Sequence, residues 1–343
     1  MSLGERLRSA RRRAGLSLRA LADQVNVSAQ AISKYERNLD TPSSSVLIRL
    51  SRVLGVSIER LLRPQKVRLS GVSYRRHKTR LNKTEQEKIR EAVLYWLERY
   101  LAIEEIVENP PKFDLKKISP AIQKIEDVET AAEKLRERWH LGEDPIPHLI
   151  STCEDHGIRV GLVEGPEAFD AMAFFANDSI PVIAVNPRLP GDRQRFSIAH
   201  ELGHLFLQLP SDWQEKQIEE AAFRFAGAFL IPKQQVLRQL GPQRSRLEYW
   251  QELHPLKHRY GISMQAIVRR AYDLGVIKKH VYESICKSFR QRGWHKMEPG
   301  VPYPPEKTER LEQLTFHALN EGLISQRRAE ELLEKPVRDN VTV

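Results

Sequence analysis

Residues 195–208 read RFSIAHELGHLFLQ, and the spacing of their polar side chains decides how the central part of the chain is interpreted. Residues four positions apart lie on the same face of an α-helix, so His200 and His204 can bind a single ion, with Glu201 one step round from the first imidazole. Small Gly203 leaves room beside this site. Neutral imidazoles bind Zn²⁺ at about 2.0 to 2.1 Å, so the spacing predicts a zinc site that needs a third ligand.

The third ligand is expected from the next apolar segment, EKQIEEAAFRFAGAFLIP at residues 215–232, which has helical periodicity. Ala222 and Ala226 belong to its small and aromatic face. Glu219 precedes them by three and seven residues, which places its carboxylate on the packed side of the predicted helix. Glu220, one position round, is the alternative ligand.

Positive charge is concentrated in the first quarter of the chain. The net charge is +10, yet residues 1–90 hold 21 Lys and Arg against 7 Asp and Glu, so the remaining 253 residues carry a net charge of −4. A basic segment of this kind is attracted to polyphosphate through counterion release, without any base sequence being read. A solvated basic surface is the alternative explanation, and charge alone does not separate the two.

The first helical segment, LGERLRSARRRAGLSLRALADQVNVSAQAISKYERN at residues 3–38, contains two internal stops. Gly15 ends the first predicted helix, and Ser17 is a suitable N-cap for the second. A tight turn then precedes Ser28, which caps a third helix. Two short helices joined by so tight a turn form a helix-turn-helix.

Two further amphipathic helices, predicted at about 44–54 and 57–62, complete a compact five-helix bundle. The serine caps, the pair Tyr35-Glu36 and the Pro42 that leads into the fourth helix resemble the Cro/C1-type (Xre-type) DNA-binding domain, over Leu3 to Leu62. This resemblance implies binding to palindromic double-stranded DNA as a homodimer. A bundle used only for dimerisation is the alternative.

The resemblance places the recognition helix at Ser28 to Arg37, and its first residues point into the major groove in that geometry. The base-reading candidates are Ala29, Gln30, Ser33 and Lys34. Arg19, Arg37 and the run Arg11 to Arg13 are expected near the phosphate backbone, where they position the domain. The full set assigned to DNA contact is Arg19, Ser28, Ala29, Gln30, Ser33, Lys34 and Arg37.

A basic linker is predicted after residue 63, and Thr84 with Glu87 forms a capping box that opens a long connector helix to about Glu108. The broad aromatic stripe of this helix indicates a core or a dimer interface. Helices are then predicted near 128–139 and 146–153, and strands at 158–163 and 179–187.

The passage PVIAVNPRLPGDRQRFSIAHELGHLFL, residues 181–207, followed by Glu219 and FAGAFLIP, resembles the ImmA/IrrE family of metallopeptidases. The resemblance implies a zinc centre with His200, His204 and Glu219 as ligands and Glu201 as the catalytic acid and base. The chain departs from the family pattern at Phe223, where an Asn is usual.

Other residues have weaker claims to the site. The strand 182–186, if it is a sheet edge, would hold an extended protein substrate by β-addition. His254, His258 and Tyr260 are downstream candidates for stabilising the transition state, but a structural role is the more common one for such residues.

The C-terminal part contains a second sequence pattern typical of a helix-turn-helix at 256–277, with Gly261-Ile262 as the turn and Ser263 as N-cap. Because its surface is only moderately basic, we expect it to pack against the catalytic helices. A proline-rich turn, Pro299 to Pro305, and two final helices follow.

The predicted fold class is mainly α with a small mixed sheet (α+β). It combines an N-terminal five-helix domain with a zincin-like metallopeptidase domain and a helical tail. The predicted division is 1–63 for DNA binding, 64–110 for linker and connector helix, 111–250 for the metallopeptidase, and 251–343 for the helix-turn-helix-like unit and tail.

No run of 18 apolar residues occurs, and Met1 to Ala22 is interrupted by arginine, so a cytoplasmic protein without membrane association is expected. Only Cys153 and Cys286 are present, which argues against a disulfide framework or a cysteine zinc site.

The function that these resemblances imply is a transcriptional regulator with a zinc-dependent endopeptidase domain. Its expected substrate is a repressor or antitoxin of the Cro/C1 type, in stress response or mobile-element control. One alternative is a DNA-binding repressor whose peptidase-like domain senses a metal, peptide or metabolite without proteolysis. The other is the antitoxin half of a toxin–antitoxin pair. Intact Glu201 favours catalysis, because a sensor does not need it.

Overall fold

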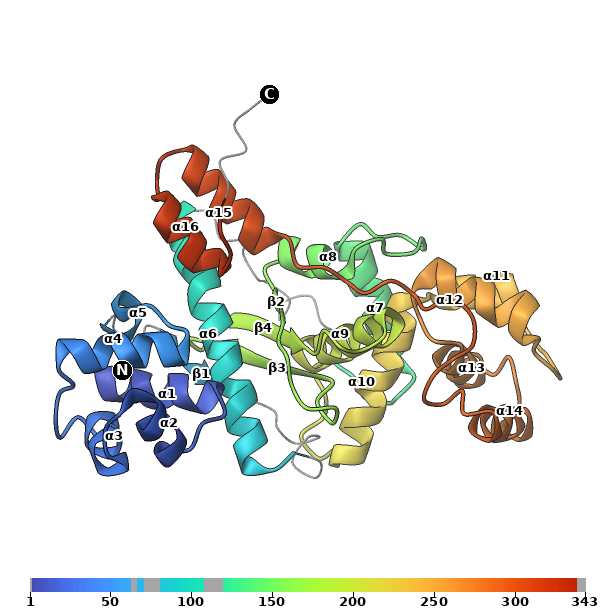
Figure 1. The fold of residues 1–343 in the computed structure, drawn as a ribbon. Coiled ribbons are helices and arrows are strands. Elements are labelled where there is room, and N and C mark those ends of the chain that lie inside the picture. The colour runs from blue at the N-terminus through green and yellow to red at the C-terminus, as the bar shows by residue number, and fades with distance from the viewer. Residues whose placement is uncertain (1, 63–66, 71–80, 108–119, 338–343) are drawn as a thin grey trace.

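The computed structural model describes residues 2–62, 67–70, 81–107 and 120–337. Helices surround a small mixed sheet, with the N-terminal bundle on one side and the helices of residues 233–291 on the other (Figure 1). This confirms the mainly helical α+β class. Within these ranges no helix is long and apolar enough to cross a bilayer.

The N-terminal bundle has the five predicted helices: α1 (Leu3–Arg13), α2 (Leu18–Val25), α3 (Ala29–Glu36), α4 (Ser44–Leu54) and α5 (Ile58–Leu62). Ser17 and Ser28 cap α2 and α3, and their hydroxyls accept hydrogen bonds from Ala20 N at 3.1 Å and Ala31 N at 3.0 Å. Asn26 ends α2 in the left-handed region (φ 52°), which makes the tight turn. A separate apolar core closes this unit.

The central sheet has strand order β1-β3-β4-β2. Its strands are β1 (Leu69–Ser70), β2 (Arg159–Leu162), β3 (Ala171–Ala176) and β4 (Ile180–Val185). β4 pairs antiparallel with β3 and parallel with β2, so it lies inside the sheet. The prediction that residues 182–186 form a substrate-binding edge was therefore wrong, because both edges of that strand already carry ladder hydrogen bonds.

Sequence reasoning also missed β3. Its sequence AMAFFA is rich in alanine and has no polar alternation, since both of its faces are covered. The hairpin to β4 turns through Asn177 (φ 48°) and Asp178 (φ 61°), both in the left-handed region that this tight connection requires. In the sequence, the pair Asn177-Asp178 was the signal that could have indicated this hairpin.

One face of the sheet is covered by the long helix α6 (Lys83–Val107), and its aromatic stripe is core. A Cβ at Gly161 of β2 would lie 2.7 Å from the Trp96 ring, so glycine is needed for this close packing. The helix is thus part of the sheet's core and more than a connector, while the predicted boundaries at 63, 110 and 250 stay predictions. Asn82 and Glu85, not Thr84 and Glu87, exchange the capping hydrogen bonds, at 2.8 and 2.9 Å.

The opposite face of the sheet packs against a larger helical core. Its helices are α7 (Asp127–Arg138), α8 (Leu149–Asp155), α9 (Gly191–Phe206), α10 (Glu215–Leu230), α11 (Lys233–Leu240), α12 (His254–Tyr260), α13 (Met264–Asp273) and α14 (Lys279–Gln291), with a π-helical turn η1 (Tyr249–Leu253) before α12. The turn between α12 and α13 has Gly261 at φ 62° and Ser263 as N-cap, as predicted. Ile267 and Val268 of α13 are buried in this core, so the second helix-turn-helix unit packs inward.

The C-terminal segment returns across the molecule. Residues 298–309 pass over the first half of α9, where a Cβ at Gly191 would lie 2.0 Å from the Pro304 carbonyl oxygen. Helices α15 (Arg310–Asn320) and α16 (Gln326–Leu333) then lie against α6 (Figure 1). From there Glu331 accepts a hydrogen bond from Ser57 of the N-terminal bundle at 3.2 Å.

Candidate metal centre and helix-turn-helix surface

Helix α9 holds the two histidines of the HELGH stretch on one face. His200 has 3% of its side chain exposed and His204 has 19%, so the first imidazole is buried and the second borders solvent. Their Nε2 atoms lie 3.1 Å apart. The i, i+4 spacing thus directs both ring nitrogens to one point, as the sequence predicted.

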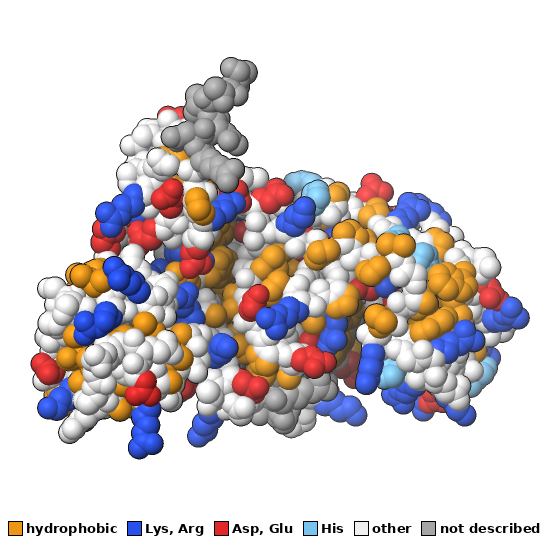
Figure 2. Space-filling model, in the orientation of Figure 1, with side chains coloured by type: hydrophobic (Ala, Val, Ile, Leu, Met, Phe, Trp, Pro, Cys, Tyr) orange, Lys and Arg blue, Asp and Glu red, His pale blue; other side chains and the backbone are white. Residues whose placement is uncertain are grey.

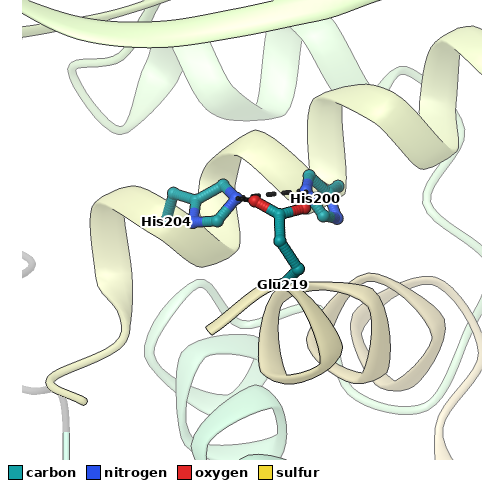
Figure 3. A group of neighbouring side chains, drawn as sticks. All are labelled: His200, His204 and Glu219. Atoms are coloured by element: carbon teal, nitrogen blue, oxygen red, sulfur yellow. Dashed lines mark hydrogen bonds and ion pairs between the residues drawn. The ribbon is translucent and has the colours of Figure 1, made fainter. Parts of the chain in front are cut away.

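Helix α10 faces α9 and brings Glu219 to that point (Figure 3). Its Oε2 lies 3.4 Å from His200 Nε2 and its Oε1 lies 3.4 Å from His204 Nε2. Gly203 makes this approach possible, because a Cβ there would lie only 3.1 Å from the Phe225 ring of α10. The small residue therefore makes room for the opposite helix, which carries the third polar group.

Glu220, the alternative third ligand, points elsewhere. It is exposed on the outer side of α10 and pairs with Arg269 at 3.4 Å. The structure thus brings together Glu219, and not Glu220, with the two histidines.

The spacing of the three groups fits a metal ion. One ligand atom from each residue lies within 4.8 Å of the others, and the three closest approaches are 3.1, 3.4 and 3.4 Å. Ligands at about 2.0 to 2.1 Å from a tetrahedral zinc ion are separated by about 3.3 to 3.4 Å. Two imidazoles and one carboxylate are also a donor set that zinc prefers, and they leave a fourth position open.

The local electrostatics keep the carboxylate ionised. Burial by itself raises the pKa of Glu219, but hydrogen bonds and charge from His200 and His204 outweigh it and hold that pKa well below its usual range. An ionised carboxylate is the form that binds a metal ion.

Glu201, the predicted catalytic group, lies on α9 directly after His200 and is 8% exposed. His254, His258 and Tyr260 lie on α12. The two histidine rings are 4.7 Å apart, and the Tyr260 hydroxyl donates to Gln235 Oε1 at 3.1 Å. These three side chains are not part of the metal-binding group found among the described residues.

Phe223 occupies the position where the sequence departs from the ImmA/IrrE pattern. It lies one turn after Glu219 on α10, and its ring centroid is 4.5 Å from that of His200. The residue is 39% exposed. The departure therefore places an apolar ring directly beside a metal-binding group.

Two features that support α9 were not foreseen from the sequence. Arg195 is fully buried and pairs with Glu306, whose backbone N–H also donates to Gln194 Oε1 at 3.0 Å. Lys257 bridges Asp192 at 2.9 Å and Glu298 at 2.8 Å. Glu306 and Glu298 come from the returning C-terminal segment, more than 100 residues after Arg195 and Asp192, and local periodicity carries no signal for such contacts.

The predicted DNA-contact residues gather on and around α3. Gln30, Lys34 and Arg37 are exposed along one side of α3, Arg19 and Ser28 are exposed nearby, and Ala29 and Ser33 are half-buried. Lys and Arg side chains stand out from this unit in the space-filling view (Figure 2). The described parts of the chain thus leave this side of α3 accessible to a duplex.

The run Arg11 to Arg13 has other partners, which corrects its expected place at the DNA backbone. Arg11 binds Glu36 through two nitrogens at 2.5 and 2.9 Å. Arg12 pairs with Glu87 of α6 at 3.3 Å, and the Arg13 guanidinium lies 3.6 Å from the centroid of the Tyr95 ring, also on α6. These arginines hold the bundle together and against α6.

Comparison with known proteins assigns both parts of the chain. A helix-turn-helix family model matches residues 7–61, and the model of the IrrE N-terminal-like domain, a peptidase family, matches residues 153–272. The HTH-type transcriptional regulator ImmR of Bacillus subtilis (strain 168) is 36% identical over 91 residues, which is 26% of this chain and 68% of ImmR. The HTH-type transcriptional regulator SinR of the same organism is 41% identical over 61 residues, or 18% of this chain and 55% of SinR. SinR of Bacillus licheniformis gives the same identity and coverage.

Proposed function

Because the chain belongs to the HTH-type transcriptional regulators and carries an IrrE N-terminal-like peptidase domain, we propose that it is a DNA-binding regulator with a working zinc endopeptidase site. The observation that carries the proposal is the convergence of His200, His204 and Glu219 at 3.1 to 3.4 Å, with Glu201 adjacent. His200, His204 and Glu219 would hold the ion.

Glu201 performs the proton transfers in this proposal. Zinc supplies Lewis acidity that polarises the peptide carbonyl and makes a water acidic. Glu201 accepts the proton of the attacking water and returns it to the leaving amine, so one carboxylate acts first as base and then as acid. Its place directly after His200 on α9 supports this role.

Double-stranded DNA is the proposed ligand of the N-terminal unit, with α3 in the major groove. Gln30 suits adenine, and Lys34 suits guanine or a phosphate. Ser28, Ala29 and Ser33 line the same end of α3, and Arg19 and Arg37 flank it as phosphate contacts. A homodimer is part of the proposal, and the exposed apolar side chains of Leu39 and Ile48 on this unit support it.

The proposed substrate is a repressor or antitoxin of the Cro/C1 type, in stress response or mobile-element control. The chain's own helix-turn-helix unit supports this choice, since a regulator that shares an operator with its substrate meets that substrate at high local concentration.

A sensor function is the second candidate, and one observation favours it. Residues 298–334 contact α9 at Arg195 and then the DNA-binding unit at Arg13, so they form a continuous physical path between the two. In this reading the metal site would alter DNA binding without cutting a protein.

Replacing Glu201 by glutamine separates the two candidates. Metal analysis of the purified Glu201→Gln protein should show the zinc content of the parent, because no ligand is changed, whereas His200→Ala should lose the ion. In cells under stress, mass spectrometry of protein N-termini should find new cleavage sites with the parent and not with Glu201→Gln. If parent and variant leave the same proteins uncut, the peptidase proposal fails.

A further inference from the structure

A pocket lies between the N-terminal bundle and α6, which are side by side in Figure 1. Arg6 and Arg13 of α1 and Arg60 of α5 line one wall, and Tyr95 and Glu98 of α6 line the other. We refer to these five residues as the arginine pocket. Its lining includes no residue of the metal centre and none of α3, so neither proposed function accounts for it.

Positive charge is crowded in the arginine pocket. Arg6 and Arg60 both bind the same oxygen of Glu98, Oε2, at 3.0 and 2.8 Å. The guanidiniums of Arg13 and Arg60 lie 3.6 and 3.9 Å from the centroid of the Tyr95 ring. The three arginine side chains are only 10 to 22% exposed, and burial lowers the pKa of Arg60 although Glu98 opposes this effect. A further negative charge would therefore be stabilised here.

Carboxylates near the pocket supply little of that charge. Glu334 lies 3.9 Å from Arg13, but its other oxygen is held more closely by Arg99, at 2.9 Å. Glu91 accepts a hydrogen bond from the hydroxyl of Ser9. Within the described ranges Arg13 thus has only one long ion pair, and its charge is the least compensated of those facing the pocket.

Glu98 presents the opposite need. Its second oxygen, Oε1, is buried and accepts no hydrogen bond from any described residue. A carboxylate oxygen can only accept, so the pocket combines guanidinium donors with one acceptor that lacks a donor. A ligand that satisfies both must be an anion that carries a proton of its own.

The size of the cavity restricts this anion. It offers about 20 Å³ to the centres of water-sized groups, and a single water needs about 10 to 15 Å³. A compact anion of a few oxygen atoms fits this space, whereas a nucleotide or a segment of DNA does not.

We propose that the arginine pocket binds inorganic phosphate, with its charged oxygens on Arg13 and Arg60 and its hydroxyl donating to Glu98 Oε1. Guanidinium groups match phosphate oxygens in geometry and charge. Inorganic phosphate also keeps an O–H at neutral pH, which sulfate and the phosphodiesters of DNA do not. The bound anion joins α1 and α5 to α6, and it is independent of the proposed peptidase activity.

Sulfate is the discriminating probe, because it has the shape of hydrogen phosphate and a double negative charge but no proton to donate. The full chain is titrated calorimetrically with each anion at neutral pH and constant ionic strength. Phosphate should bind at one saturable site, and sulfate should bind at least about tenfold more weakly, since it places an unprotonated oxygen against Glu98 Oε1. Arg13→Gln should weaken phosphate binding at least about tenfold. Arg8→Gln removes an exposed arginine of the same helix and should bind phosphate like the parent.

Glu98→Gln tests the hydroxyl contact by itself. The glutamine amide can donate to either anion, so this variant should lose the preference for phosphate over sulfate. Circular dichroism of each variant shows whether it is folded, and Arg13→Gln provides the test if Glu98→Gln is not. His200→Ala is titrated alongside, because phosphate can also bind a zinc ion, and it should keep the phosphate affinity of the parent.

Three results would each overturn the proposal. The first is an equal affinity of the parent for sulfate and phosphate, or no saturable binding of either. The second is unchanged phosphate binding by folded Arg13→Gln. The third is loss of phosphate binding in His200→Ala, which would place the anion at the metal centre.

Discussion

The buried guanidinium of Arg195, five residues before the first histidine of the metal centre, is paired with Glu306 of the returning C-terminal segment. Arg195 also donates to the Ile146 carbonyl at 2.7 Å, and Glu306 accepts from Ile150 N at 3.2 Å. This one pair therefore joins α9, the start of α8 and the C-terminal segment.

We expect Glu306→Ala to destabilise the protein by about 3 to 5 kcal/mol, because it leaves the Arg195 charge buried without its carboxylate. The measurement is the free energy of unfolding from urea titration followed by tryptophan fluorescence. Glu164→Ala is the control, since its pair with Arg188 is about 70% exposed on both sides and should contribute no more than about 1 kcal/mol. Equal effects of the two substitutions would show that the buried pair contributes no more to the free energy of unfolding than the exposed pair does.

Glu219→Ala should weaken zinc binding at least about 100-fold, because it removes a ligand from the ion. Competition with a chromophoric chelator measures the affinity. Glu220→Ala changes the adjacent carboxylate and only breaks an exposed pair with Arg269, so it should bind zinc like the parent. Similar losses in both variants would contradict the assignment of Glu219.

Lys34→Ala should weaken binding to an operator selected from a random DNA pool by about 1 to 3 kcal/mol if Lys34 reads a base. If Lys34 contacts phosphate, the slope of the logarithm of the binding constant against the logarithm of the salt concentration should instead become shallower by about one unit. Fluorescence anisotropy over a range of salt concentrations separates these cases. Lys279→Ala removes an equally positive, 74% exposed side chain on α14 and should have no effect. Unchanged binding by Lys34→Ala would reject α3 as the recognition helix in this orientation.

Glu154 predicts a pH dependence of stability. Burial between α8 and α6 raises the pKa of Glu154 from about 4.5 to about 8, although the Tyr100 hydroxyl donates to it at 3.0 Å. The folded protein therefore keeps a proton that the unfolded chain loses, so this stabilisation is complete below pH 4.5 and disappears as the pH rises through 8.

Between pH 5 and 8 the free energy of unfolding of the parent should fall by roughly 1 to 3 kcal/mol relative to that of Glu154→Gln. Urea titrations at several pH values measure the difference. Glu133→Gln, at an exposed position of α7, should follow the parent. Parallel pH profiles for the parent and Glu154→Gln would mean that this carboxyl is ionised in the folded protein.

The parts of the fold that the sequence predicts well depend on nearby residues. Serine hydroxyls at 17, 28 and 263 cap the helices that they were expected to cap, because a capping hydrogen bond spans only three residues. The convergence of His200 and His204 follows in the same way from the pitch of one helix. To predict Glu219 as the third group, the packed side of a second helix also had to be identified. The helical periodicity of residues 215–232 was enough to favour Glu219 over Glu220.

The parts that were missed depend on distant residues. Strand β3 forms because α6 and α9 cover its two faces, and its own alanines give little sign of a strand. The capping pattern at the start of α6 is present twice within a few residues, and local sequence does not choose between Asn82-Glu85 and Thr84-Glu87. The partners of Arg11 to Arg13 lie on other helices, so composition correctly predicts a basic segment and wrongly predicts which arginines are free to meet DNA.

The hydrogen bond between Ser57 and Glu331 has a consequence for synthesis. The two residues are 274 positions apart, so at roughly 5 to 20 residues per second the ribosome needs about 15 to 55 seconds to add the second after the first. The DNA-binding unit leaves the ribosome and folds long before its C-terminal partner exists. A nascent chain at this stage therefore carries the helix-turn-helix unit without the Ser57–Glu331 contact that joins it to α16 in the complete protein.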